Sequence, residues 1–310
     1  MNPFSDLAPL PRQLHVPCVR DLAWALTSPP LLAQAPAAQR HPLAGSEWAA
    51  DPDRLAAWLR MQDTEPERLQ AFLAQGPVRR LGMYYEQLWR YALAAAPGVT
   101  VLAAGLAVRE AGRTLGEFDL LLADATGIHH LELAVKFYLG PPEGGGQAAA
   151  QWLGPGCHDR LDKKLAHLAE RQLRLGQAPA GRAALARAGA ALARPAMWLG
   201  GYLFSPWPQG CATLSDAHPQ HLRGQWLPAS AWPAYAATQP SARWSPLPRA
   251  RWLAPANGLE PLDARGVAQW LQGDEPMMQA RMLAKIDEGG SEVARLMVVP
   301  QAWPQLPKRY

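Results

Sequence analysis

The sequence has few of the features that mark secreted, metal-caged or membrane-spanning proteins. Only three of its 310 residues are cysteine, namely Cys18, Cys157 and Cys211. They are too few and too scattered for a disulfide framework or a zinc site, so we expect a reducing, cytoplasmic compartment. The Ala-rich stretch without charge, 91–108, has 18 residues and contains a Pro-Gly pair, whereas a membrane span needs about 20 apolar residues. The N-terminus also lacks the charged and apolar regions of a signal peptide, and we expect no membrane partner.

Lysine is scarce as well, with five residues against 25 arginines, so the place of each lysine is informative. What the chain does have is an ordinary globular composition, because 49% of its residues are hydrophobic and 18% are charged. This composition excludes a disordered or collagen-like chain. The net charge of +4 is a weak argument for a polyanionic partner. Its excess lies in residues 181–310, which carry 13 basic and 8 acidic side chains.

The distribution of proline and of apolar residues predicts three segments. Residues 1–78 have the pattern of short helices separated by prolines, and acids and bases balance there. Residues 79–206 have the pattern of a core, and residues 207–310 that of a Pro- and Trp-rich extension that packs on the core. The helices expected in the first segment span 20–27, 52–61 and 65–74.

The middle segment has the order α-β-β-β-α-β, which predicts an α/β fold with a mixed sheet flanked by helices. The expected elements are a helix over 79–96, strands over 99–110, 116–124 and 128–139, a long helix over 159–175, a helical stretch over 181–193 and a fourth strand over 196–206. Because proline removes backbone donors, few central strands are expected after residue 206. A helix over 275–286 and a strand over 294–299 are expected to close the chain.

Charged side chains interrupt two apolar strands in the middle segment. Asp119 lies within the apolar run 118–122. In the next strand, alternation places His130, Glu132 and Lys136 on one face. A buried carboxylate is costly unless it is paired, hydrogen-bonded or bound to a metal. Two acids and one of only five lysines therefore point to a site on these neighbouring strands.

Phosphodiester hydrolysis uses these groups. Carboxylates on adjacent strands can hold divalent ions that activate water and stabilise the attacking and leaving oxygens. A nearby lysine can orient the water or neutralise the charge that develops on phosphorus. Carboxylate oxygens favour Mg²⁺ or Mn²⁺, so these are the expected cofactors.

The same residues carry a resemblance to known families. The segments G-E-F-D (116–119) and H-L-E-L-A-V-K (130–136) resemble the signature of the PD-(D/E)XK nuclease superfamily, whose core has the same order of helices and strands. Over about residues 79–175, and more loosely to the end, the chain is similar to an uncharacterised bacterial family, domain of unknown function 1853. The similar segments are RLGMYYEQLW, GEFDLLL, HLELAVKFYLG and GPGCHDRLDKKL.

This resemblance implies a restriction-endonuclease-like core and a metal-dependent nuclease of DNA or RNA. It implies that Asp119 and Glu132 are metal ligands, that Lys136 is the catalytic lysine, and that Glu86 is an accessory acid. The superfamily spaces acid and lysine as E-x-K, whereas here Ala134 has that place. Lys136 follows two residues later, about 6.6 Å along the strand. The alternative is therefore an inactive protein on the same fold that binds nucleic acid or a protein partner.

Each of these residues also has a structural interpretation. Glu132 and Lys136 can form an ion pair that only stabilises the strand. Glu86 has Arg90 four residues later, which is the spacing of an ordinary helix surface pair. His130 is either an extra ligand or base, or a histidine whose ring is satisfied by a backbone group.

The helix expected over 159–175 carries a basic stripe. At about 100° per residue, its basic side chains fall within one arc beside an arc of leucines, where a phosphate backbone can run. A solvated helix surface is the alternative. The stripe consists of Arg160, Lys164, His167, Arg171 and Arg174. In the superfamily this helix often adds a polar or basic residue to the site, for which Lys163, Lys164 and Gln172 are the unranked candidates here.

Two further features leave other functions open. Trp244 and Trp252 flank an arginine-rich stretch and either stack single-stranded bases or pack in loops. A working surface in the Trp- and Pro-rich part would make the core a scaffold, and would show as a large exposed aromatic patch. The glycines at 144–146 lack the Gly-Lys-Ser/Thr sequence of a phosphate loop and suggest a flexible loop over the site.

Overall fold

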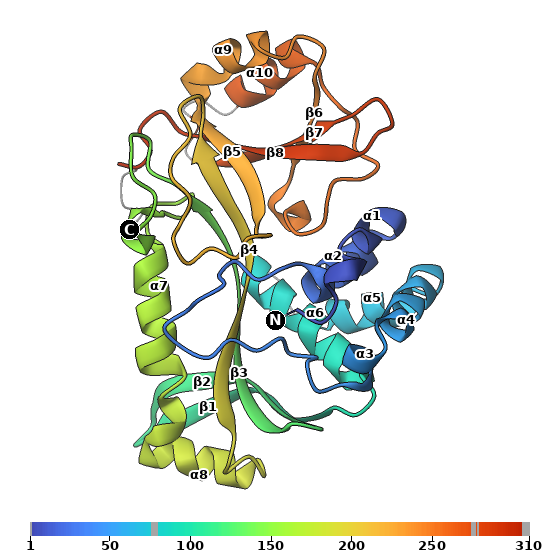
Figure 1. The fold of residues 1–310 in the computed structure, drawn as a ribbon, viewed down its shortest axis with the longest axis vertical. Coiled ribbons are helices and arrows are strands. Elements are labelled where there is room, and N and C mark those ends of the chain that lie inside the picture. Colours follow the sequence, from blue (N-terminus) through green and yellow to red (C-terminus); the bar gives the residue numbers. More distant parts are fainter. Residues whose placement is uncertain (1, 76–79, 274–276, 278, 306–310) are drawn as a thin grey trace. The chain divides into compact units, whose positions relative to one another are not determined.

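The computed structural model describes residues 2–75, 80–273, 277 and 279–305 (Figure 1). Its eight strands form a mixed sheet in the order β1-β2-β3-β4-β5-β8-β7-β6. This confirms the expected α/β class with a mixed sheet. The strands are β1 (Thr100–Glu110), β2 (Arg113–Asp124), β3 (Gly127–Leu139), β4 (Arg194–Pro206), β5 (Leu222–Pro228), β6 (Arg243–Leu247), β7 (Arg281–Ile286) and β8 (Glu292–Val299).

The chain divides into two compact units, and each is discontinuous in sequence. The first contains residues 1–135 and 164–200, and the second contains residues 136–163 and 201–310. This division cuts across the three consecutive segments expected from the sequence. The reason is that β3 and β4 each run from one unit into the other.

The first unit begins with helices, as expected from the proline spacing. They are α1 (Leu10–Gln13), α2 (Pro17–Thr27), α3 (Glu47–Ala50), α4 (Pro52–Thr64), α5 (Glu67–Ala74) and α6 (Leu81–Ala95). In α6, Tyr85, Leu88, Trp89 and Ala92 are buried at helical spacing. This buried face fixes the rotation of α6 and thereby the direction of Glu86.

The antiparallel strands β1, β2 and β3 follow α6 in the first unit. Their bounds agree closely with the expected strands, because each apolar run ends at a short Gly-containing turn. Part of their core consists of Val108, Phe118 and Leu121, which pack against Ala184 and Leu185 of helix α8 (Pro179–Arg187).

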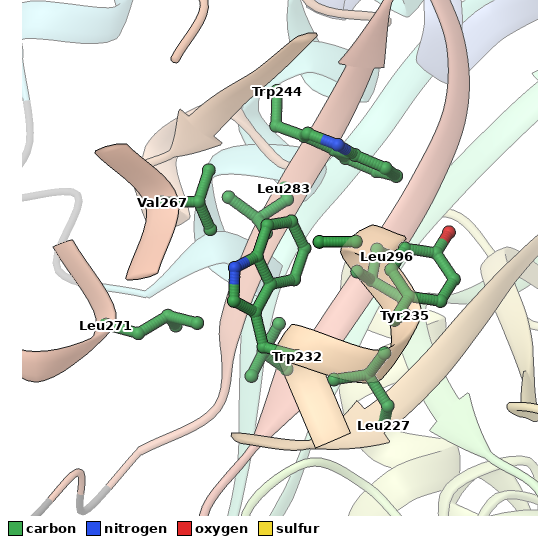
Figure 2. Close-up of a cluster of buried hydrophobic side chains, with 10 residues drawn as sticks. Leu227, Trp232, Tyr235, Trp244, Val267, Leu271, Leu283 and Leu296 are labelled. Carbon is green, nitrogen blue, oxygen red and sulfur yellow. The ribbon is translucent and has the colours of Figure 1, made fainter. Parts of the chain in front are cut away.

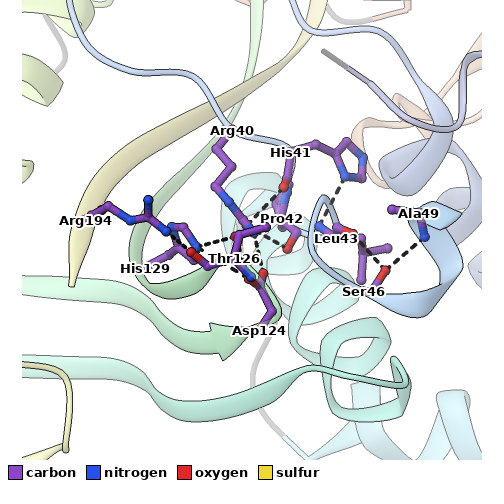
Figure 3. A network of polar contacts seen from close by, with 10 residues as sticks. All are labelled: Arg40, His41, Pro42, Leu43, Ser46, Ala49, Asp124, Thr126, His129 and Arg194. Atoms are coloured by element: carbon purple, nitrogen blue, oxygen red, sulfur yellow. Dashed lines mark hydrogen bonds and ion pairs between the residues drawn. The ribbon is translucent and has the colours of Figure 1, made fainter. Parts of the chain in front are cut away.

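A polar network holds the turn between β2 and β3 (Figure 3). The carboxylate of Asp124 accepts hydrogen bonds from the backbone N–H and the hydroxyl of Thr126, at 2.9 and 2.7 Å, and pairs with Arg40. The guanidinium of Arg194 donates to the Thr126 carbonyl. A Cβ added at Gly45 would lie only 2.3 Å from the Asp124 carboxylate. The turn is therefore fixed by packed polar contacts from three separate segments.

The expected long helix over 159–175 is replaced by two shorter elements. The α-helix α7 spans Leu161–His167, and a π-helical turn, η3, spans Leu168–Gln172. The wider π turn shifts the phase of every later side chain, so the periodicity of 100° per residue fails after Leu168.

The second unit has its own aromatic and aliphatic core (Figure 2). Trp232, Tyr235 and Trp244 pack with Leu283 and Leu296, and all five side chains are buried. The tryptophans after Pro206 therefore fill a core instead of forming a surface. The helices of this part are α9 (Trp232–Ala237) and α10 (Ala264–Gln272).

Two expectations for this part of the chain are wrong. β5 and β8 lie between other strands of the sheet, because the residues of β5 up to Leu227 lack proline and can donate to a ladder. The helix expected over 275–286 is strand β7 over its last six residues, where pairing with β8 overrides local propensity. Residues 275, 276 and 278 of that expected helix lie outside the described residues. Pro246 falls on β6, the last strand in the sheet order, as the missing donor requires.

Close approach of two backbones requires a glycine on β4. Gly201 has a φ of 135°, and a Cβ there would lie 1.7 Å from the Lys136 carbonyl oxygen. Only glycine fits at this position without moving one of the strands. No helix in the described part of the chain combines the length and the apolar character needed to cross a membrane.

Candidate functional site

Two carboxyl groups face each other on the neighbouring strands β2 and β3. The antiparallel register pairs Leu120 with Leu131. The register described for these strands ends at this pair, and Asp119 and Glu132 are the next residues along; their side chains are in hydrogen-bond contact. The Oδ2 atom of Asp119 also accepts a hydrogen bond of 3.0 Å from the backbone N–H of Leu133. The expected juxtaposition of these two acids is therefore present.

Glu132 is fully buried and has a partner on each carboxylate oxygen. The Nε2 atom of His130 lies 2.7 Å from Oε1, and the side-chain amide of Gln172 donates to Oε2. These contacts come from β3 itself and from the π-helical turn η3. A carboxylate held in this way has one orientation, which is a property of metal ligands and catalytic acids.

Burial dominates the electrostatics of the pair. It raises the pKa of Asp119 to about 7, and the negative charge of Glu132 raises it further. Burial likewise raises the pKa of Glu132 to about 7, while a hydrogen bond from Asp119 and the charge of Lys164 oppose the shift. Because two adjacent buried carboxylates repel each other, the pair retains a proton near neutral pH unless a cation joins it.

His130 is neutral at this pH. Burial lowers the pKa of its imidazole to about 4. The ring packs edge-on against Phe118, with the ring centroids 4.7 Å apart. Of the two interpretations left open, the partner is a carboxylate of the site and not a backbone group. A neutral imidazole can orient Glu132 without adding charge.

Glu86 of α6 is electrostatically linked to the pair. Burial raises the pKa of Glu86 to about 7, and the charges of Asp119 and Glu117 raise it further. The charge of Arg90 lowers it, as the spacing of four residues indicates. Glu86 therefore belongs to the acidic group on these strands. Glu117, inside the G-E-F-D segment, has a share in this group that the sequence interpretation missed.

Lys136 and Lys164, two of the three lysines considered from the sequence, have different surroundings. The ammonium of Lys136 forms an ion pair with Asp159, which also accepts a hydrogen bond of 3.1 Å from Tyr138. The charge of Lys164 on α7 lowers the pKa of Asp119, Glu132 and Glu86 alike. The cation that acts on all three acids is thus Lys164. The assignment of Lys136 as the catalytic lysine stays a prediction.

Gln172 links Lys164 to the acid pair. Its carbonyl oxygen accepts a hydrogen bond of 3.3 Å from Lys164 Nζ and lies 3.0 Å from Nδ1 of His167, while its amide nitrogen donates to Glu132. Lys163, the third candidate on this helix, is exposed. The π-helical turn is what brings Gln172 to this position, and π turns of this kind are frequent at functional sites.

The expected basic stripe is not continuous. Arg160 lies before the start of α7, and its guanidinium pairs with Asp162 at 2.6 and 2.8 Å. His167 faces Gln172. Arg171 and Arg174 are exposed but lie within and after the π turn. The interpretation failed because it assumed one uninterrupted α-helix.

Other candidate features are structural. Trp244 and Trp252 are 1% and 5% exposed, so neither offers a face for stacking bases. The large hydrophobic side chains exposed among the described residues include no aromatic one. The glycine loop is held in place, since the backbone N–H of Gly146 donates to Gln151 and the Trp152 indole donates to the Gly146 carbonyl.

The carboxylate oxygens of Asp119 and Glu132 are ligands of a type that suits a divalent metal. No group of three or more His, Cys, Asp or Glu side chains able to hold a metal ion is present in the part of the chain that the structure describes. Carboxylate oxygens are nevertheless the ligands that Mg²⁺ prefers, and it is often held by only one or two of them together with water and phosphate. Asp119 and Glu132 fit this pattern.

Comparison with known proteins gives a family. No curated protein and no solved structure matches the chain. The family described as Domain of unknown function (DUF1853) matches residues 20–299, a span that contains α6, the strands β1, β2 and β3, η3 and most of both units. The match covers most of the chain, and the protein therefore belongs to the DUF1853 family.

Proposed function

We propose that the protein is a metal-dependent phosphodiesterase of the PD-(D/E)XK type, acting on DNA or RNA. The observation that carries the proposal is the pair of Asp119 and Glu132, oriented opposite each other on adjacent strands with pKa values raised by burial. Raised pKa values of buried acids in a shared site are typical of catalytic centres. The α-β-β-β-α-β order and the G-E-F-D and H-L-E-L segments support the superfamily assignment.

In this proposal Asp119 and Glu132 hold Mg²⁺ or Mn²⁺. The bound cation supplies positive charge to the phosphate and lowers the pKa of a water molecule. His130 and Gln172 keep Glu132 in one orientation through the two contacts on its carboxylate. Glu86 accepts or holds a proton near neutral pH, because its pKa is raised to about 7.

Lys164 takes the role that the superfamily gives to the lysine of E-x-K. Its charge acts on all three acids, and its ammonium is held by the carbonyl of Gln172. A lysine in this place can neutralise charge that develops on phosphorus. Ala134 has the position at which the superfamily carries its lysine. In this proposal the lysine is carried by the following helix instead of the strand.

The test is a cleavage assay on single- and double-stranded DNA and RNA with Mg²⁺ or Mn²⁺. We expect the wild type to cleave at least one substrate, and Asp119→Asn and Glu132→Gln to lose about 10³-fold or more in rate, since each removes charge from the metal site. Lys164→Met should lose about 10²-fold. Lys136→Met is the matched control. If Lys136→Met lost activity while Lys164→Met did not, Lys136 would be the catalytic lysine, as the resemblance implies.

Two results would contradict the proposal. One is an Asp119→Asn variant that cleaves as fast as the wild type. The other is a wild type that cleaves nothing with either metal. If such a wild type still binds nucleic acid, the alternative of an inactive nucleic-acid-binding protein on this fold replaces the nuclease.

A further inference from the structure

A groove of about 650 Å³ lies between β1 and α8 in the first unit. Its apolar lining includes Leu102 and Leu106 from the strand and Ala184 from the helix, and it contains no aromatic side chain. Two arginines also line it, Arg109 from β1 and Arg187 from α8. The groove therefore combines an apolar lining with one arginine from β1 and one from α8.

On the α8 side of the groove, no acidic residue near in sequence balances the positive charge, whereas on the β1 side Glu117 lies opposite Ala107. No aspartate or glutamate occurs between residues 171 and 215, whereas five arginines occur between residues 171 and 194. The side chains of Arg109 and Arg187 are exposed, and neither forms an ion pair or hydrogen bond with another described residue. A groove with unpaired guanidinium groups is complementary to an anion, and planar guanidinium groups suit phosphate.

The strand register relates the groove to the acid pair along β1 and β2. Ala104 pairs with Leu120 and Leu106 pairs with Phe118, so Gly105 lies beside Asp119. Leu106, which lines the groove, is thus one residue from the strand position next to the site. Arg109 lies four residues from Gly105, which is about 13 Å along the strand.

We propose that this groove binds the sugar-phosphate backbone of the nucleic-acid strand next to the scissile phosphate, with Arg109 and Arg187 paired to phosphates. This inference rests on the proposed nuclease function and names the part of the substrate that the site holds. Because contacts to phosphates carry no sequence information, binding through these two arginines is independent of base sequence.

An acidic peptide is the competing occupant, because β1 is the first strand in the sheet order and peptides can add to such strands. Two features of β1 argue against it. Its pairing with β2 is interrupted by register shifts at Val101/Ala103 and at Val108/Arg109. Gly105 between them has a φ of 64°. Irregularities of this kind bend a strand and interrupt the ladder that an added strand needs.

The experiment measures binding without cleavage. Fluorescence anisotropy of a labelled single-stranded oligonucleotide and of a labelled duplex is followed over a range of salt concentrations in the absence of divalent metal. The proteins are the wild type, Arg109→Ala, Arg187→Ala and, as the matched control, Arg182→Ala, which is exposed on α8 but does not line the groove. Thermal unfolding checks that each variant is folded.

We expect Arg109→Ala and Arg187→Ala to weaken binding about tenfold each. Each should also reduce the slope of log K against log[salt] by about 0.7–0.9, the value for one phosphate contact. Oligonucleotides of different sequence should bind alike, and the control should match the wild type. Unchanged affinity and slope in both groove variants would overturn the inference, as would displacement by a polyglutamate peptide at concentrations where unlabelled oligonucleotide does not compete. A wild type that binds with these slopes but does not cleave contradicts only the proposed function.

Discussion

Glu132 and Asp119 differ from most acids because they are buried, and burial disfavours their charged form. Both pKa values are raised to about 7 by burial, so a folded chain near neutral pH holds protons that the unfolded chain has released. Natural sites often keep such groups at a cost to stability because the chemistry requires them. This cost can be measured without knowing the substrate.

The pair predicts that stability falls as pH rises. Between the unfolded pKa of about 4 and the folded pKa of about 7, the native state binds more protons, so the free energy of unfolding decreases with increasing pH. Asp119→Asn should flatten this dependence and should be more stable than the wild type at about pH 8 by about 1–3 kcal/mol. Urea unfolding at several pH values without divalent metal measures this difference. His130 acts in the opposite direction below about pH 6.5, where the unfolded histidine binds a proton that the native one does not, so the decrease is measured above that pH. A variant with the same pH profile as the wild type would contradict the interpretation.

The pKa of Asp124, five residues after Asp119 on β2, is shifted in the opposite direction. Its side chain is fully buried, and its pKa is lowered because the hydrogen bonds from Thr126 and the charge of Arg40 outweigh its burial. A lowered pKa means that its stabilisation is present above the unfolded value of about 4 and is lost as pH falls through the folded pKa. We therefore assign Asp124 a structural role in holding the turn between β2 and β3.

Asp124→Ala should destabilise the protein by about 2–4 kcal/mol, since it leaves Arg40 and the Thr126 donors without their buried acceptor. The free energy of unfolding in urea measures this loss. Thr126→Val is the milder control, because it removes the hydroxyl with its contacts to Asp124, Arg40 and His129 but keeps the backbone donor and the Asp124–Arg40 pair. If Asp124→Ala abolished metal-dependent cleavage at unchanged stability, the assignment of a purely structural role would be wrong.

At the scale of the elements, the π-helical turn η3 determines where Gln172 lies relative to Glu132. Gln172 is its last residue and joins Lys164 and Glu132 through one amide group. In a regular α-helix the extra residue of the turn would be absent, and Gln172 would point about 100° away. The turn is therefore the local feature that completes the site.

We expect Gln172→Leu to lower the cleavage rate about tenfold while Mn²⁺ binding weakens by a similar factor, since Glu132 loses a partner that orients it. Initial rates and a metal titration by calorimetry measure the two effects. Gln172 is a positioning residue in this view, so Gln172→Asn, which keeps the amide but shortens the side chain, should be intermediate. Equal metal affinity in wild type and Gln172→Leu would exclude this role.

Part of this site was accessible from the sequence and part was not. Asp119 and Glu132 interrupt apolar strands that follow each other in the sequence, and this interruption marks both as candidates. Glu86 was a candidate through the resemblance alone, since its spacing to Arg90 is that of an ordinary helix surface pair. The interaction of Gln172 and Lys164 with Glu132 depends on a π turn, for which the sequence offers no periodic signal. β7 was misassigned because its residues gain more from pairing with β8 than from their local helical pattern.

At the scale of the whole molecule, the two units are not consecutive in sequence. Each contains two separate stretches of chain, because β3 and β4 pass from one unit to the other. Cutting the chain at the boundary expected after residue 206 would remove β5, the hydrogen-bonded neighbour of β4. Composition does not reveal these two units, because the strands that run through both of them, β3 and β4, have ordinary composition.

The passage of β3 and β4 through both units has a calorimetric consequence. Melting of either unit frees part of two strands on which the other depends, so neither can lose its structure alone. We expect differential scanning calorimetry to give one endotherm whose van't Hoff and calorimetric enthalpies agree. Two resolved endotherms would mean that the halves of these strands melt separately.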